Sequence, residues 1–155
     1  LFNYFFNESP IKINSNGVDI LQKNIHDTTI TSFQYRKNKM GHIFVSWLHP
    51  FKEHRFVIIG SKGMLRFEDS VKNKPLTFYN KSVEYINDIP SPKVGESKRI
   101  NYKNTLPLTN ELKYFISKID SGKIEISSGD NGCEVIKILE EASKSLSNTN
   151  MEATN

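Results

Sequence analysis

Apolar and polar residues alternate along much of the first two thirds of the chain, and the spacing of apolar residues then becomes helical. Alternation with period two is typical of strands, and Thr29, Thr31, Phe33 and Tyr35 follow it. The continuous apolar run at residues 56–59 predicts a strand that is covered on both faces. In all, the pattern predicts strands over residues 11–14, 27–35, 42–48, 56–59, 64–67, 76–79 and 83–86.

Two helices are predicted after Pro107. The first has apolar residues at helical spacing and ends at Gly122, and the second begins with Asp130 as its N-cap. The apolar face of the second helix is predicted to consist of Val135, Ile138, Leu139, Ala142 and Leu146. Strands followed by two helices predict an α+β fold, an open, mostly antiparallel β-sheet with the two C-terminal helices packed on one face.

Local signals divide the chain further. Asn16–Gly17 predicts a turn, and the prolines at 90 and 92 predict an irregular crossing. Residues 1–6 resemble the end of a helix, and the chain does not begin with Met, so we expect the C-terminal part of a longer protein. A processed or trimmed start is the alternative. One domain is expected over residues 1–147, with a polar tail over 148–155.

Composition narrows the classes of partner. The 155 residues carry a net charge of +4, but no basic stripe is interleaved with aromatics, so a nucleic-acid partner is not expected. No apolar run approaches the roughly 20 residues that span a bilayer, and no signal peptide is visible, so we expect a cytoplasmic protein without a membrane partner. Cys133, the single cysteine, is predicted to be buried or half-buried.

The richest candidate chemistry lies in the polar corner at residues 46–55. Here His49 precedes Lys52 and Arg55. Arg can hold a phosphate or carboxylate with two parallel hydrogen bonds, and Lys adds a point charge, so the corner is a candidate anion site. The alternative is a solvated polar turn between strands. The spacing is poor for a metal site, and no set of carboxylate or cysteine ligands accompanies the corner, so no metal site is expected.

The sequence contains no evident dinucleotide site. No GxGxxG motif follows any predicted strand. Residues 60–63, Gly-Ser-Lys-Gly, lack the spacing of a phosphate-binding loop and run into a strand. From its residues alone, the chain is therefore not expected to bind a nicotinamide cofactor.

The order of several motifs resembles the C-terminal domain of the Gfo/Idh/MocA oxidoreductases, in particular the branch that acts on nucleotide sugars, such as UDP-N-acetylglucosamine-type 3-dehydrogenases. The resemblance rests on residues 46–52 (SWLHPFK) and 57–64 (VIIGSKGM). Residues 107–116 resemble the penultimate helix of that family, and residues 129–146 resemble its last helix.

The resemblance implies a reaction and a division of labour. Family members move a hydride between a sugar carbon and NAD(P), which an N-terminal Rossmann domain binds. The catalytic lysine of a Glu-Lys-Pro motif and an Asp/His pair would lie before Leu1, so no catalytic or cofactor-binding residue is assigned here, and His26–Asp27 does not replace them. A sugar or nucleotide-sugar substrate near His49, Lys52 and Arg55 is implied, as is a homo-oligomer through the open sheet face.

Two hypotheses follow for the function. In the first, the chain is the substrate-binding and oligomerisation domain of an NAD(P)-dependent sugar or nucleotide-sugar dehydrogenase, and it is inactive alone. In the second, it is a standalone, non-catalytic β-sheet module for self-association or partner binding.

Overall fold

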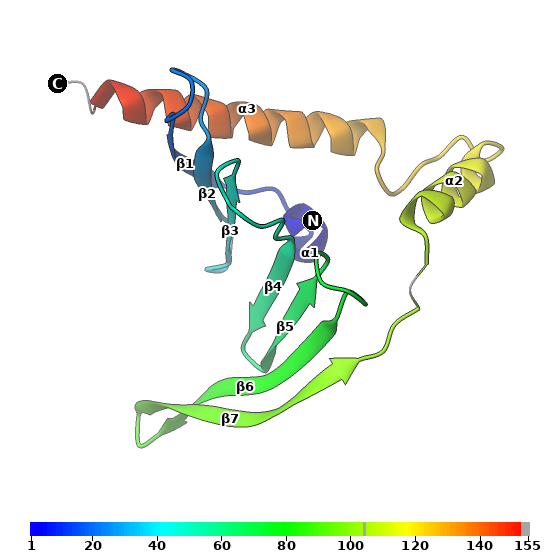
Figure 1. Ribbon diagram of the computed structural model, residues 1–155. Helices are drawn as coiled ribbons and strands as arrows, with labels where there is room; N and C mark the ends of the chain where they lie inside the picture. The colour runs from blue at the N-terminus through cyan, green and yellow to red at the C-terminus, as the bar shows by residue number, and fades with distance from the viewer. Residues whose placement is uncertain (104, 153–155) are drawn as a thin grey trace. The chain divides into compact units, whose positions relative to one another are not determined.

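The computed structural model describes the backbone of residues 1–103 and 105–152, and the side chains of these ranges up to Ser147. The elements are α1 (Phe2–Phe6), β1 (Lys12–Val18), β2 (Thr28–Gln34), β3 (Met40–Ser46), β4 (Arg55–Gly60), β5 (Gly63–Glu68), β6 (Leu76–Ile86), β7 (Ile89–Ile100), α2 (Pro107–Lys118) and α3 (Gly129–Glu152) (Figure 1). The expected α+β class with antiparallel pairing is confirmed. The strands lie in two sheets, β1-β2-β3 and β4-β5-β6-β7, where one sheet was expected.

The chain divides into two compact units. The first contains residues 1–49 together with the chain from Tyr114 onward, and the second contains residues 50–113. Each unit therefore contains one of the two sheets.

The first unit packs aromatic side chains between α1 and one face of the β1–β3 sheet. Phe33 and Tyr35 are 6% and 3% exposed. The ring of Phe2 meets Phe33 edge-on with centroids 5.6 Å apart, and the ring of Phe6 meets Tyr35 at 4.5 Å. Such edge contacts are favourable beyond the area that they bury. The apolar cluster that predicted a helix end therefore forms α1 and supplies this small core.

Helix α3 packs against β1 within the same unit (Figure 1). Ser15 on β1 is 1% exposed, and its backbone N–H donates to Oγ of Ser145 over 2.9 Å. Ile138 and Ala142 are half-buried on this helix face, whereas Leu139, predicted to share it, is 60% exposed. The predicted apolar stripe thus meets the sheet along one flank.

Both ends of α3 differ from the prediction. Oγ of Ser128 accepts from the backbone N–H of Asn131 over 3.3 Å, so Ser128 is the capping residue and Asp130 lies in the first turn. The helix continues to Glu152, past residue 148, where a polar tail was expected to begin.

The second unit buries side chains on one face of its sheet. Phe56 and Ile58 are half-buried and lie opposite Phe67 and Leu65 on β5. The alternate residues Val57 and Ile59 are 46% and 74% exposed. Within the described residues, the run is therefore covered on one face only, and the prediction that both faces are covered was wrong.

Strands β6 and β7 form one long hairpin where two short strands and an irregular crossing were predicted. The hairpin pairs Leu76 with Ile100 at one end and Ile86 with Ile89 at the other. Asn87 and Asp88 make the turn with φ values of 50° and 62°, as a type I′ turn requires. Pro90 and Pro92 lie on β7, which is the edge of the sheet, where a missing N–H breaks no ladder.

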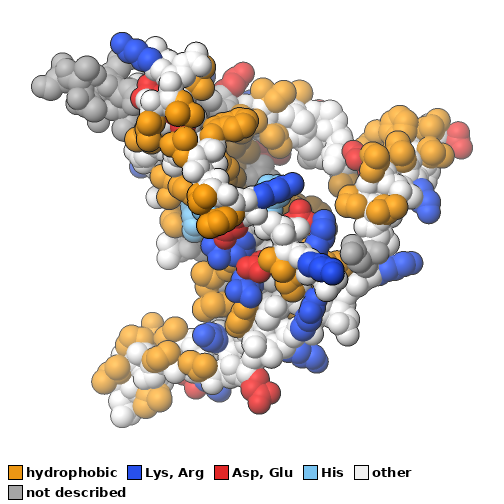
Figure 2. All heavy atoms as spheres, in the orientation of Figure 1, with side chains coloured by type: hydrophobic (Ala, Val, Ile, Leu, Met, Phe, Trp, Pro, Cys, Tyr) orange, Lys and Arg blue, Asp and Glu red, His pale blue; other side chains and the backbone are white. Residues whose placement is uncertain are grey.

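Helix α2 contributes no buried residue. Its end agrees with the prediction, because the N–H of Gly122 donates to the carbonyl of Lys118 and Gly122 adopts a φ of 63°. Apolar side chains stand exposed on α2 and at the tip of the β6–β7 hairpin, and both appear as hydrophobic surface in Figure 2. Two helices were expected to pack on a sheet face. Helix α3 does so, whereas the apolar side chains of α2 are exposed.

Candidate functional site

The three predicted substrate-binding residues fall in different units. His49 is the last residue of this segment of the first unit, whereas Lys52 and Arg55 belong to the second. Arg55 opens β4, and its Nη2 lies 3.1 Å from Oε1 of Glu53. Lys52 is exposed and forms no ion pair with any described residue. The anion site of these three residues stays a prediction.

A second polar cluster lies where β4 begins and β5 ends. Asp69 is its centre: its Oδ1 lies 2.5 Å from Nζ of Lys74, and its Oδ2 lies 3.8 Å from Nδ1 of His54. The strand register explains this proximity, because Arg55 is paired with Glu68 and the next residues outward are His54 and Asp69. The N–H of Asp69 donates to the carbonyl of His54 over 2.8 Å.

Two hydrogen bonds between side chains and the backbone hold this cluster in place. The N–H of His54 donates to Oγ of Ser70 over 3.0 Å, and the hydroxyl of Tyr102 donates to the carbonyl of Lys74 over 2.6 Å. The hydrogen bond from Lys74 is the largest cause that lowers the pKa of Asp69, and the same contact raises the pKa of Lys74. Both charges are therefore present at neutral pH, and Asp69 can orient the imidazole of His54.

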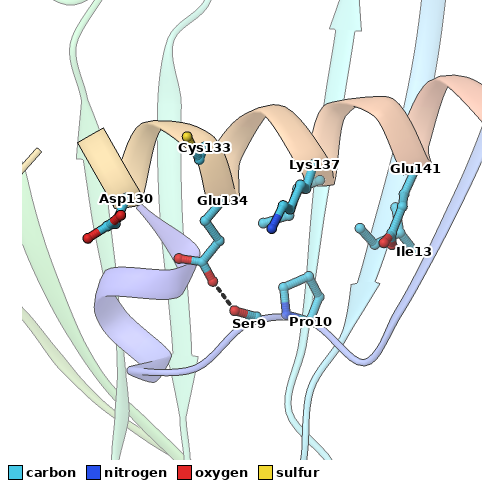
Figure 3. Close-up of a pocket in the computed structure, with 9 residues that line it drawn as sticks. Ser9, Pro10, Ile13, Asp130, Cys133, Glu134, Lys137 and Glu141 are labelled. Carbon is cyan, nitrogen blue, oxygen red and sulfur yellow. Dashed lines mark hydrogen bonds between the residues drawn. The ribbon is translucent and has the colours of Figure 1, made fainter. Parts of the chain in front are cut away.

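A cavity of about 420 Å³ opens in the first unit between the α1–β1 connection and the first turns of α3. Glu134 and Ser9 point toward one another across it, and the hydroxyl of Ser9 donates to Oε1 of Glu134 (Figure 3). Lys137 and Glu141 follow along the same helix. The lining also includes three apolar residues, Pro10, Ile13 and Ile138.

Cys133 lines this cavity and is exposed, so the prediction of a buried or half-buried cysteine was wrong. It precedes Glu134, Ile138 and Ala142, which form the half-buried face of α3, and it falls outside that face. Its side chain leaves the helix on the side away from Ser9 and Pro10 (Figure 3).

The described residues do not fit a nicotinamide dinucleotide. Such a cofactor binds where a parallel strand runs through a glycine-rich turn into a helix N-terminus. All strand pairs among residues 1–103 and 105–152 are antiparallel, and α3 follows a loop. Within the same ranges, no group of three or more His, Cys, Asp or Glu residues could hold a metal ion. No helix of the described chain is long and apolar enough to cross a membrane.

The sequence was compared with models of known protein families. The model of the oxidoreductase family C-terminal alpha/beta domain, Gfo/Idh/MocA, matches residues 1–152. This chain belongs to that family. The resemblance inferred from residues 46–64 and from the two C-terminal helices is thereby confirmed over nearly the whole sequence.

A solved structure shares the fold. UDP-N-acetylglucosamine 3-dehydrogenase GnnA from Acidithiobacillus ferrooxidans superposes with a TM-score of 0.73 at 14% sequence identity. The match covers 90% of this chain and 43% of the GnnA chain, so this chain spans less than half of that enzyme. A search of curated proteins found no match.

The His54–Asp69–Lys74 cluster was not predicted as a unit from the sequence. His54 lies in the polar corner at residues 46–55, but Asp69 and Lys74 come 15 and 20 residues later. The signal that finds them is the hairpin register: a tight turn at residues 60–63 places residues equally distant from it side by side. Counting outward from that turn leads to His54 and Asp69.

Proposed function

We propose that this chain is the substrate-binding and oligomerisation part of an NAD(P)-dependent sugar or nucleotide-sugar dehydrogenase. The observation that carries the proposal is the family match over residues 1–152 to the C-terminal domain of an oxidoreductase family. The fold likeness to a UDP-N-acetylglucosamine 3-dehydrogenase supports a nucleotide sugar as the substrate class.

In this proposal, another part of the protein binds the nicotinamide cofactor, which accepts or donates the hydride. This division is consistent with the antiparallel sheets, which offer no dinucleotide crevice among the described residues. The residues of this chain bind and orient the sugar nucleotide, and they lower the entropy cost of bringing the reacting carbon to the cofactor.

Lys52 and Arg55, with His49, are proposed to contact an anionic group of the substrate, a diphosphate or a carboxylate. Arg55 already has a carboxylate neighbour in Glu53, which holds its guanidinium near the strand end. Lys52 is exposed and has no ion pair with a described residue, so its ammonium is available to a ligand.

Steady-state kinetics of the full-length protein test the assignment. Lys52→Ala and Arg55→Ala are each expected to raise KM for the nucleotide sugar by about tenfold, because a charge-assisted hydrogen bond is lost. The value of kcat should change much less, since the proposed contacts are made to the anionic group of the substrate and not to its reacting carbon. Lys62→Ala removes an exposed charge from the β4–β5 turn and should leave KM unchanged. Equal kinetics in all three variants would contradict the assignment.

Cofactor titration tests the division of labour. The 155-residue chain is expected to show no saturable binding of NADH by fluorescence, whereas the full-length protein should bind it. Saturable binding by this chain alone would contradict the proposal. Failure of the full-length protein to bind either NADH or NADPH would instead favour the standalone β-sheet module.

A further inference from the structure

A row of side chains crosses the β4–β7 sheet on one face. Arg66 on β5 is paired with Thr77 on β6, and Thr77 is paired with Arg99 on β7. Residues that lie directly opposite one another in neighbouring strands point to the same side of the sheet. The two guanidinium groups and the hydroxyl between them therefore share one face. We call these three residues the arginine row.

Positive charge predominates around the arginine row. Alternation along β6 places Tyr79 and Lys81 on the same face as Thr77. Glu68 lies two residues after Arg66 on β5, so its carboxylate is on the same face. Arg99 and Lys81 are exposed and form no ion pair with any described residue. Arg55 is paired with Glu68 and therefore lies on this face as well, so four cations accompany the carboxylate of Glu68.

Arg66 has an anionic and an aromatic neighbour on this face. Its Nε lies 3.6 Å from Oε1 of Glu68, and its Cζ lies 5.5 Å from the centroid of the Tyr79 ring. Neither contact uses the Nη nitrogens of Arg66, which can donate to another acceptor.

The spacing of the arginine row suits a phosphorylated ligand. Arg66 and Arg99 are two strands apart, which corresponds to about 10 Å between their Cα atoms. Both side chains are long enough to reach a ligand above Thr77. Guanidinium groups match the oxygens of a phosphoryl group with parallel hydrogen bonds, and a hydroxyl donates a further one.

We propose that the arginine row, extended by Lys81, is a binding site for the phosphoryl groups of a ligand. The proposal does not rest on the dehydrogenase activity, because the binding of a phosphorylated ligand is measured without any turnover. The chemistry is common to inorganic pyrophosphate and to the diphosphate of a nucleotide sugar, and the experiment distinguishes these sources.

Isothermal titration of the purified full-length protein with inorganic pyrophosphate at low ionic strength tests the site. The wild type is expected to bind saturably. Arg99→Ala is expected to weaken the affinity at least about tenfold, because a charge-assisted contact is removed. Lys98→Ala removes the same charge from the neighbouring position, whose side chain points to the opposite face of the sheet. This matched control should change the affinity by less than about twofold.

Further outcomes either support or overturn the proposal. Equal weakening by Arg99→Ala and Lys98→Ala, or the absence of saturable binding by the wild type, would show unspecific attraction and overturn it. A changed oligomeric mass of Arg99→Ala with unchanged pyrophosphate affinity would make the row a protein interface and overturn it too. If UDP-N-acetylglucosamine displaces pyrophosphate, and this depends on Arg99, the ligand is a nucleotide diphosphate. If pyrophosphate binds without being displaced, the ligand is inorganic.

Discussion

At the scale of single residues, the charge on Asp69 organises the start of β4 and the end of β5. Lys74 donates to it and lowers its pKa below the ordinary value of 3.8. Because the pKa is lower in the folded protein, this contribution to stability is present above the unfolded pKa and is lost as the pH falls through the folded pKa. The pH window therefore lies below about pH 4.

Replacing Lys74 by Met should raise the pKa of Asp69 toward its ordinary value, because the dominant hydrogen bond is removed. Carboxyl-detected NMR titration measures this shift directly. Lys72→Met is the matched control, since Lys72 is exposed nearby and forms no ion pair with a described residue. An unchanged pKa of Asp69 in Lys74→Met, or an equal rise in both variants, would contradict the ion pair.

The absence of a Cβ at Gly17 allows the backbone of a neighbouring strand to approach closely. Asn16–Gly17 was predicted as a turn, but both residues lie within β1. A Cβ on Gly17 would lie 2.9 Å from the backbone carbonyl oxygen of Thr28, which cannot move aside without disturbing the ladder. The glycine therefore serves the close approach of the chain at residue 28 rather than a reversal.

Gly17→Ala is expected to lower the free energy of unfolding by about 1–3 kcal/mol, because the added methyl group overpacks the strand. Gly132→Ala is the opposite control, since a Cβ there meets nothing within 4 Å and the residue lies inside α3. That variant should gain up to about 1 kcal/mol from helix propensity. Urea unfolding of both variants measures the contrast, and a neutral Gly17→Ala would contradict the packing described.

At the scale of elements, the contact between α3 and β1 includes a polar pair beside its apolar residues. The N–H of buried Ser15 donates to Ser145, whose hydroxyl also lies 3.5 Å from the carbonyl of Ser15. Ser145→Ala should cost about 1–3 kcal/mol of unfolding free energy, because a buried donor loses its partner. Ser143→Ala removes an exposed hydroxyl from the same helix and should stay within about 0.5 kcal/mol. Equal unfolding midpoints in both variants would argue against the pair.

How much of these elements the sequence predicts depends on the kind of signal. Alternation located β2 and β3 to within about two residues, and helical spacing located α2 and α3. The β6–β7 hairpin was missed because Pro90 and Pro92 were treated as strand breakers, although an edge strand tolerates them. The Asn87–Asp88 turn was the local signal that would have revealed the hairpin.

The candidate sites were harder to predict for a physical reason. His54 and Asp69 become neighbours through the pairing of β4 with β5, and Arg66 and Arg99 lie in one row through two successive pairings. The spacing of residues in the sequence does not reveal such pairings, because each pairing depends on the positions of the turns between the strands.

At the scale of the whole molecule, the proposed homo-oligomer concerns the face of the β1–β3 sheet that α1 and α3 leave uncovered. Phe44 on β3 lies opposite Ile30 on β2, and they are 56% and 47% exposed. Val18 and Met40 lie on the same face by alternation and are also exposed. Paired apolar side chains in the middle of a sheet face are the kind of residues that another subunit buries.

Phe44→Lys places a charge in the centre of this face and is expected to weaken self-association of the full-length protein by about tenfold or more. Light scattering after size exclusion, over a range of concentrations, measures the shift to smaller mass. Leu21→Lys is the matched control, because Leu21 is 69% exposed in the loop between β1 and β2 and lies outside this face. A wild type that is monomeric at high concentration, or an equal shift in both variants, would refute an oligomer built on the open sheet. A shift confined to Phe44→Lys would instead identify this sheet face as the subunit contact, because the control adds the same charge elsewhere on the unit.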